Sequence, residues 1–385
     1  MHYSVMSKIS MSPAIRHSSP RSSKPDLVLI AAVGGLIFIG ILFIYSSSGL
    51  IGEKLTGDQL FFFKKHVISI LLGILVFLCA IKIPVDFYYR HYILILVVSV
   101  FLLIAVFIPG IGKTVSGSTR WIRAGFIRFQ PSEILKFSIL IYLSHILYVK
   151  QDRIQNFSRG VLPPVTIVGF ICLLILLQPD VSTAVIFIML MGIMLFISGV
   201  PVLFLVSLCI PAIPAAVFLL ETNPYLVRRF AFLNPYSDPF GKGYHLIRSF
   251  SSFQNGGLTG VGPGNAQPFL KKLPEAHTDF IFSVIGEEIG LVGGAAVICI
   301  YLLLASRGFK IAHIQNTLRN YLLAFGITAL IILETIIHFF VTLGLIPTTG
   351  LPLPFISYGR TSLLLHCFFI GILLQLSRNK GQHSG

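Results

Sequence analysis

Three titratable side chains stand together just before a long apolar run. Glu275, His277 and Asp279 close a polar stretch, and the apolar segment 280–285 follows directly. Desolvation at such a boundary raises the pKa of a carboxyl group, whereas a nearby Arg or Lys lowers it. These opposing effects can tune a carboxylate to accept a proton near neutral pH. The pattern therefore predicts a general base here, with helix capping by Thr278 or Asp279 as the alternative.

Arginines in polar loops offer a second kind of chemistry, the binding of an anion. They are Arg120, Arg123, Arg128, Arg228 and Arg229. Guanidinium groups can hold phosphate or carboxylate through paired hydrogen bonds. Attraction to lipid headgroups is the other explanation for such a basic surface.

Two further polar motifs lie at or inside apolar segments. Lys136 lies about one turn into such a segment, three residues after Glu133, so the two side chains share one helix face. A Lys at membrane depth is costly and usually faces a polar cavity or a partner, which favours a functional role. Asp180, after Gln178 and Pro179, is expected to cap the next helix rather than to catalyse.

Composition predicts the elements that must position these residues. The 385 residues are 55% hydrophobic and 11% charged, with a mean hydropathy of +0.87, which is far more apolar than a soluble domain. A membrane span needs roughly 20 apolar residues. Such runs lie near 27–46, 67–84, 92–109, 133–149, 161–177, 181–198, 201–220, 279–304, 320–343 and 361–377. The predicted fold class is all-α, a polytopic integral membrane protein with about ten transmembrane helices.

The chain divides into one membrane domain, 27–377, and two short tails, 1–26 and 378–385. The basic first tail precedes an apolar run without an evident cleavage site, which predicts a retained signal anchor. Short loops on the side of the two tails carry more Lys and Arg than those on the other side, so both termini are predicted to be cytoplasmic. The long loop 221–278 is then extracytoplasmic.

Two patterns in this chain favour structural rather than chemical roles. The glycine-rich segment 260–264 has no preceding strand and no following Lys-Ser/Thr, so close backbone packing is a better explanation than a nucleotide site. The five cysteines lie in apolar runs without C-x-x-C spacing, so neither a disulfide framework nor a cysteine metal site is predicted.

Several strings along the chain, taken in order and spacing, carry a family resemblance. They are Gly117-Ser118-Thr119-Arg120-Trp121-Ile122, Phe129-Gln130-Pro131-Ser132-Glu133 with Lys136, Gln178-Pro179-Asp180, Arg228-Arg229 with Phe232-Leu233-Asn234-Pro235, Leu273 to Phe282, Gly286-Glu287-Glu288 and Pro347 to Gly359. Together they resemble the SEDS (shape, elongation, division, sporulation) family, whose members include FtsW, RodA and SpoVE. The wording Val284-Ile285-Gly286-Glu287-Glu288 looks more like the FtsW branch.

The resemblance implies a peptidoglycan glycosyltransferase on the outer face of the bacterial inner membrane, acting in cell division. Lipid II would be both donor and acceptor, and Asp279 would be the catalytic carboxylate of an inverting reaction. Implied substrate or pyrophosphate ligands are Arg120, Lys136, Arg228, Arg229, Glu275, His277, Ser357 and Arg360. A divalent cation, Mg²⁺ or Mn²⁺, is the cofactor to consider. The expected partners are lipid II, a class B penicillin-binding protein, other divisome proteins and membrane lipids, and no nucleic acid.

The chain departs from the family pattern in three places. Residues 266–269 read Ala-Gln-Pro-Phe, Arg360 replaces a usual Gly, and His338 and Thr342 stand where asparagines are usual. Arg360 could bind pyrophosphate or pair with an acid such as Glu287 or Glu334. A transporter or flippase for lipid-linked precursors remains an alternative, because it would also carry buried charges in many helices. A scaffold that recruits a penicillin-binding protein is a third.

Overall fold

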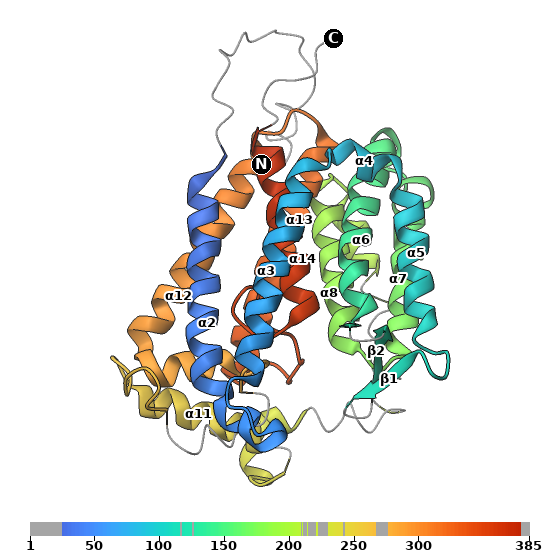
Figure 1. Ribbon diagram of the computed structural model, residues 1–385. Coiled ribbons are helices and arrows are strands. Elements are labelled where there is room, and N and C mark those ends of the chain that lie inside the picture. Colours follow the sequence, from blue (N-terminus) through green and yellow to red (C-terminus); the bar gives the residue numbers. More distant parts are fainter. Residues whose placement is uncertain are drawn as a thin grey trace.

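The long helices of the protein run side by side in one bundle (Figure 1). The computed structural model describes residues 25–115, 118–124, 127–208, 210, 214, 221, 230–241, 243–266 and 276–378. The long helices are α2 (Leu27–Thr56), α3 (Phe61–Lys82), α5 (Tyr92–Ala105), α6 (Pro131–Val149), α7 (Leu162–Leu176), α8 (Val181–Ile197), α12 (Ile281–His313), α13 (Leu318–Thr342) and α14 (Arg360–Arg378). Shorter helices are α4 (Val85–Arg90), η1 (Gln151–Arg153), η2 (Phe157–Val161), η3 (Phe230–Leu233), η4 (Pro235–Ser237) and α11 (Tyr244–Gly256).

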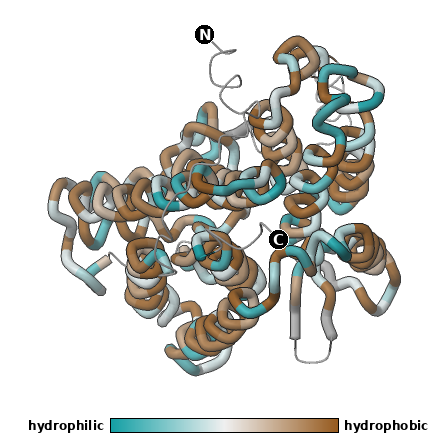
Figure 2. Tube along the Cα trace, turned by 90° about the horizontal axis from the view of Figure 1, so that it is seen from above, coloured by the Kyte–Doolittle hydropathy of each residue, from teal (hydrophilic) through white to brown (hydrophobic). Residues whose placement is uncertain are grey.

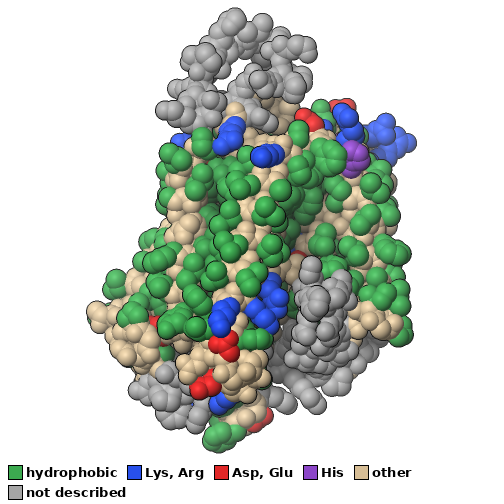
Figure 3. Space-filling model, viewed as in Figure 1, with side chains coloured by type: hydrophobic (Ala, Val, Ile, Leu, Met, Phe, Trp, Pro, Cys, Tyr) green, Lys and Arg blue, Asp and Glu red, His purple; other side chains and the backbone are tan. Residues whose placement is uncertain are grey.

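The bundle has the composition of a membrane domain. In the described part of the chain, seven helices are long and apolar enough to cross a membrane, and α5 and α8 are shorter apolar helices. Large apolar side chains face outwards, among them Leu71, Phe101 and Leu302, each more than half exposed. Seen from above, most of the trace of the bundle is hydrophobic (Figure 2). On the face shown in Figure 3, hydrophobic side chains cover the middle of the molecule, and Lys and Arg lie towards its two ends. The predicted all-α, multi-span fold is confirmed, although most of the predicted span 201–220 lies outside the described residues.

The two ends of the bundle differ. The first residue of α2 and the last of α14 lie at one end, here called the termini end (Figure 1). An ion pair of 2.6 Å between Arg307 and Asp26 and a hydrogen bond of 3.1 Å from Gln315 to the carbonyl of Leu376 tie helices together there. The opposite end, here called the site end, carries α11 and the start of α12. The described members of the predicted titratable cluster, His277 and Asp279, therefore lie at the end opposite the start of α2 and the end of α14.

A small antiparallel sheet lies at the site end, where sequence reasoning had placed only a polar loop. Its strands are β1 (Gly112–Val115), β2 (Ser118–Ala124) and β3 (Ile127–Phe129), in that order. Ile122 on β2 lies opposite Phe129 on β3, and Ile122 packs with Ala105 and Val106 at the end of α5. The sheet thus anchors Arg120 on β2. It also leads directly into Pro131, which starts α6.

Helix α12 bends at Gly290, whose backbone is non-helical at φ 66° and ψ −167°. The glycine-rich segment lies along this bend: Val261 N–H donates to the carbonyl of Glu287 at 3.0 Å, and Leu291 N–H donates to Gly257 at 2.9 Å. A side chain on Gly260 would overlap the carbonyl of Glu288. The prediction of close backbone packing is therefore confirmed for Gly260, whereas a methyl group on Gly264 would meet nothing within 4 Å.

Candidate functional site

The segment 277–279 is held from one side by residues 343–359, here called the α13–α14 loop. Tyr358 N–H donates to the carbonyl of His277 at 2.9 Å, and the hydroxyl of Ser357 donates to the carbonyl of Thr278 at 2.6 Å. Gly350 faces the third residue, because a methyl group built on it would lie 3.6 Å from Oδ2 of Asp279. The loop therefore fixes the backbone of the predicted catalytic segment.

Asp279 lies one residue before the N-cap of α12. The N-cap is Phe280, and its side chain makes no capping hydrogen bond. Asp279 is half-buried and has interactions of its own. Capping by Thr278 or Asp279 therefore stays an alternative to a role in catalysis.

His277 is packed among aromatic rings. Its ring centroid lies 4.5 Å from that of Phe62 on α3 and 5.5 Å from that of Tyr358. Burial raises the pKa of the Tyr358 hydroxyl above its ordinary value, so this hydroxyl stays protonated at neutral pH. Ser357 is bonded within the protein on both sides, since its hydroxyl also accepts from Leu353 N–H at 2.8 Å. As placed, Ser357 and Tyr358 position the segment that contains His277.

Arg120 is engaged with the turn between α7 and α8. Its Nε donates to the carbonyl of Gln178 at 3.1 Å, its Nη2 donates to the carbonyl of Pro179, and its Nη1 lies 3.6 Å from Oδ1 of Asp180. Asp180 also accepts from the N–H and the hydroxyl of Thr183, at 3.4 and 2.9 Å. The prediction that Asp180 caps the following helix is confirmed.

The α13–α14 loop connects the Arg120 turn with Asp279. The hydroxyl of Ser182, in the first turn of α8, donates to the carbonyl of Thr349 at 3.0 Å. Gly350, the next residue, is the one that faces Asp279. The helix α8, whose first turn follows the turn bound by Arg120, therefore contacts the same loop that faces Asp279.

Lys136 belongs to a buried charge cluster. Its Nζ lies 2.6 Å from Oε1 of Glu133 and 2.7 Å from Oε1 of Glu334 on α13. The other oxygen of Glu334 lies 2.8 Å from Nε2 of His366 on α14. All four side chains are almost fully buried. The predicted pair of Lys136 with Glu133 is confirmed, but Glu334 and His366 had not been assigned to it, although an acid and a histidine inside apolar runs are themselves a signal.

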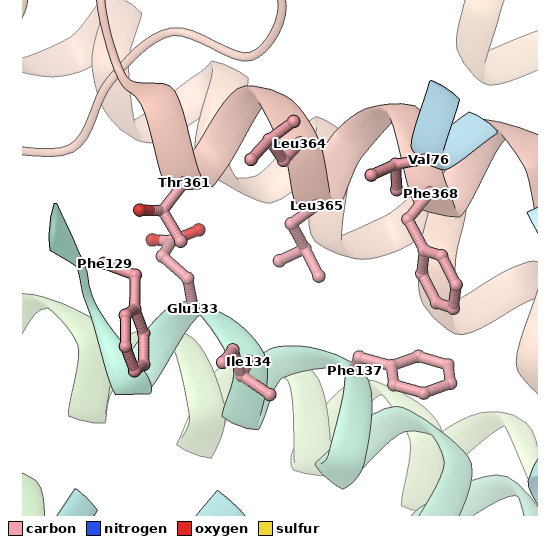
Figure 4. A pocket seen from close by; sticks show the side chains of 9 residues that line it. All are labelled: Val76, Phe129, Glu133, Ile134, Phe137, Thr361, Leu364, Leu365 and Phe368. Atoms are coloured by element: carbon pink, nitrogen blue, oxygen red, sulfur yellow. The ribbon is translucent and has the colours of Figure 1, made fainter. Parts of the chain in front are cut away.

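A cavity of about 330 Å³ opens between α3, α6 and α14, beside this cluster. Figure 4 shows Glu133 and Thr361 close together at one end and Phe137 and Phe368 at the other. The remaining lining residues are Val76, Phe129, Ile134, Leu364 and Leu365. Oε2 of Glu133 is buried and has no hydrogen-bond partner among the described residues. The cavity is therefore apolar along most of its length, with Glu133 and Thr361 at one end.

The remaining predicted residues are placed as follows. Glu275, Arg228 and Arg229 lie outside the described residues, as do the side chains of Arg123 and Arg128. Arg360 begins α14, is half-buried and bonds to the side chain of Tyr358. It makes no ion pair with a described acid: Glu334 is taken by Lys136 and His366. Its suggested pairing with Glu334 is therefore wrong.

The other departures and buried acids have structural contacts. His338 donates from Nδ1 to the carbonyl of Leu351 at 2.9 Å, within the α13–α14 loop. Glu288 accepts a hydrogen bond from the hydroxyl of Ser46 on α2. Within the described residues no group of three or more His, Cys, Asp or Glu side chains is placed to hold a metal ion.

Comparison with known proteins decides the family. The FtsW, RodA and SpoVE family model, described as cell cycle protein, matches residues 26–382. The chain belongs to this family. Similar SEDS relatives include the probable peptidoglycan glycosyltransferase FtsW of Geobacter sulfurreducens, 38% identical over 92% of this chain and 96% of the relative. Another is stage V sporulation protein E of Bacillus subtilis, 34% identical over 93% of this chain and 98% of the relative.

Solved structures place the SEDS fold as well. A chain from a structure of a peptidoglycan synthase complex, described as coordinating polymerization and crosslinking, matches with a TM-score of 0.79 and 25% identity, covering 93% of this chain and 99% of that one. The rod shape determining protein RodA of Thermus thermophilus matches with a TM-score of 0.69 and 23% identity, covering 94% of this chain and all of that one. The fold of this chain is thus a SEDS fold over nearly its whole length.

Proposed function

We propose that this protein is a peptidoglycan glycosyltransferase that polymerises lipid II into β-1,4-linked glycan strands during cell division. The observation that carries the proposal is the placement of Asp279, half-buried at the site end and faced by Gly350 of a loop that also holds His277 and Thr278. The names of its relatives in the family support the same activity. The enzyme would work on the outer face of the inner membrane, with both termini in the cytoplasm.

In the proposed reaction Asp279 acts as the general base. Its carboxylate takes the proton from the 4-hydroxyl of the acceptor GlcNAc as that oxygen attacks the anomeric carbon of the donor MurNAc. The bond from that carbon to the pyrophosphate breaks, and undecaprenyl pyrophosphate leaves with the electron pair. Attack opposite an α-linked leaving group inverts the carbon and gives the β-linkage. A positioned base of this kind contributes about 10²–10⁴-fold to a rate.

Cationic residues would stabilise the negative charge that grows on the pyrophosphate. We assign this role first to Arg360, whose described contacts include no acid, together with Arg228 and Arg229 of the long loop. Arg120 and Lys136 would have to exchange contacts they already make, with Gln178 and Pro179 carbonyls or with two carboxylates. A divalent cation, Mg²⁺ or Mn²⁺, would supply further positive charge to the leaving pyrophosphate.

The apolar cavity beside Glu133 supports a lipid-linked substrate. Its walls come from three helices of the bundle, and its polar end lies at Glu133 and Thr361 (Figure 4). A hydrocarbon chain would bury apolar surface there. The structural relative from a peptidoglycan synthase complex supports a transpeptidase, a class B penicillin-binding protein, as the protein partner.

The test is polymerisation of fluorescent lipid II by purified protein together with its transpeptidase partner. Asp279→Asn keeps the size of the side chain and removes the base, so strand formation should fall about 10²–10⁴-fold while lipid II binding is retained. Asp152→Asn, an exposed carboxylate at the termini end, is the matched control and should polymerise at the unsubstituted rate. Strands formed by Asp279→Asn at an undiminished rate would remove Asp279 from catalysis. Translocation of lipid II across liposomes without strand formation would favour a flippase instead.

A further inference from the structure

The buried charge cluster contains members that the proposed reaction does not use, among them His366. His366 on α14 faces Glu334 on α13 with Nε2 2.8 Å from Oε2. Glu334 also forms an ion pair with Lys136, which in turn pairs with Glu133. The cluster thus links α6, α13 and α14 inside the membrane domain.

Both ring nitrogens of His366 lie close to oxygen atoms. Nδ1 lies 2.7 Å from the carbonyl oxygen of Ser362, which can only accept a hydrogen bond, and 3.2 Å from the Ser362 hydroxyl. Nε2 lies 2.8 Å from Oε2 of Glu334, whose Oε1 lies 2.7 Å from Nζ of Lys136. A proton on each ring nitrogen, as proposed below, gives the cluster two positive and two negative charges.

This balance matters because the cluster is out of water. Glu334 and His366 are 2% and 0% exposed, and an uncompensated charge at such a depth is costly. Without His366, one ammonium group would be left with two carboxylates. If His366 and the charge of Glu334 were both removed, the positive charge of Lys136 and the negative charge of Glu133 would cancel.

The cluster also bounds the α13–α14 loop. Glu334 and His366 lie on the two helices that this loop joins, and the ring of His366 lies 5.4 Å from that of Phe355 in the loop. One turn after Glu334, His338 donates to the carbonyl of Leu351. The spacing between α13 and α14 therefore sets where the loop meets the 277–279 segment.

We propose that His366 is a positioning residue: as the second positive charge of the cluster, it holds α14 against α13 and keeps the α13–α14 loop seated on residues 277–279. Its effect on catalysis by Asp279 rests on the proposed function. Its effect on the loop does not.

The first test follows amide hydrogen exchange of the peptide 351–359 in purified protein in lipid nanodiscs. His366→Leu should speed exchange at least about tenfold, because the loop is no longer held on residues 277–279. The double variant His366→Leu/Glu334→Gln should return to within about threefold of the unsubstituted protein, since its charges balance again. His145→Leu, a histidine of α6 that stacks on Tyr92, is the matched control and should exchange normally.

Slow exchange in the double variant would distinguish charge balance from packing. If His366→Leu acted through lost packing, adding Glu334→Gln would speed exchange further instead of slowing it. Unchanged exchange in His366→Leu, or exchange in the double variant as fast as in the single one, would overturn the proposal. If His366→Leu yields no folded protein, recovery of folded double variant supports the proposal, and loss of both overturns it. In the polymerisation assay we expect His366→Leu to form strands more slowly than the unsubstituted protein and the double variant to recover. If the unsubstituted protein forms no strands, the proposed function is wrong, but the exchange experiment still tests the role of His366.

Discussion

At the scale of single residues, the segment before Asp279 is held by its backbone. The carbonyls of His277 and Thr278 accept hydrogen bonds from Tyr358 N–H and the Ser357 hydroxyl. Backbone carbonyls fix the chain without using the side chains of the segment. Ser357, which the resemblance implied as a substrate ligand, has a positioning contact on each side.

Ser357→Ala tests this positioning. The substitution leaves the Leu353 N–H and the Thr278 carbonyl without their partner in a buried setting, which costs about 1–3 kcal/mol. We expect a lower kcat for strand formation with KM for lipid II nearly unchanged, measured by steady-state kinetics. Ser251→Ala is the control, because its hydroxyl bonds only to the carbonyl of Ile247 in its own helix. A raised KM with an unchanged kcat would instead make Ser357 a substrate ligand.

The sequence predicted the chemistry of single residues in part. Glu133 and Lys136 could be paired because three residues separate them on one helix. Their partners Glu334 and His366 could not, because long-range pairing depends on which helices touch, and apolar patterns of membrane helices carry little of that information. The role of Arg120 at the Gln178–Asp180 turn was hidden for the same reason. The assignment of Asp279 came from the family resemblance and remains a proposal.

At the scale of elements, the bend of α12 and the glycine-rich segment form one unit. Backbone hydrogen bonds join residues 257–262 to residues 287–292, on both sides of Gly290. Gly290 adopts a positive φ that L-residues with side chains rarely adopt. The unit lies in the first part of α12, the helix that begins just after Asp279. Its geometry therefore sets the direction of the rest of α12 relative to the site.

Gly290→Ala should disrupt this unit. A side chain there would overlap the backbone nitrogen of Gly260, and the positive φ itself costs about 1–3 kcal/mol in a non-glycine residue. We expect a Tm several degrees lower in a detergent thermal scan. Gly34→Ala in α2, where an added methyl group meets nothing within 4 Å, should leave the Tm unchanged. Equal Tm values for the two variants would show that the bend tolerates a side chain.

The helices were predictable and the sheet was not. Runs of about 20 apolar residues mark membrane helices strongly. The strands β1 to β3 are 4, 7 and 3 residues long, and their Gly, Ser, Thr and Arg content is equally typical of a loop. Strand preference depends on packing against neighbours, here Ala105 and Val106, which sequence spacing alone does not reveal.

At the scale of the whole molecule, the bundle has two chemically different ends. The termini end is tied by Arg307 and Asp26, whereas the site end holds the sheet, α11 and the 277–279 segment. The proposed reaction on the outer face requires the site end to be outside. Orientation is therefore a test of function that needs no substrate.

Labelling of single cysteines checks the orientation. In a cysteine-free background, Phe240→Cys at the site end should react with a membrane-impermeant maleimide in cells whose outer membrane is opened, because Phe240 is 92% exposed. Asp152→Cys at the termini end should react only after the inner membrane is permeabilised. The reverse pattern would place the site in the cytoplasm and contradict synthesis on the outer face.

The proposed zero net charge of the buried cluster has a consequence in a cell with a membrane potential. A voltage across the membrane does work on net charge, about 2.3 kcal/mol per elementary charge per 100 mV. With His366 charged as proposed, the two carboxylates are balanced by Lys136 and His366, and the cluster has almost no net charge on which the field can act. The position of the α13–α14 loop on residues 277–279 should then not depend on the membrane potential. The site should have the same geometry in vesicles without a potential as in a living cell.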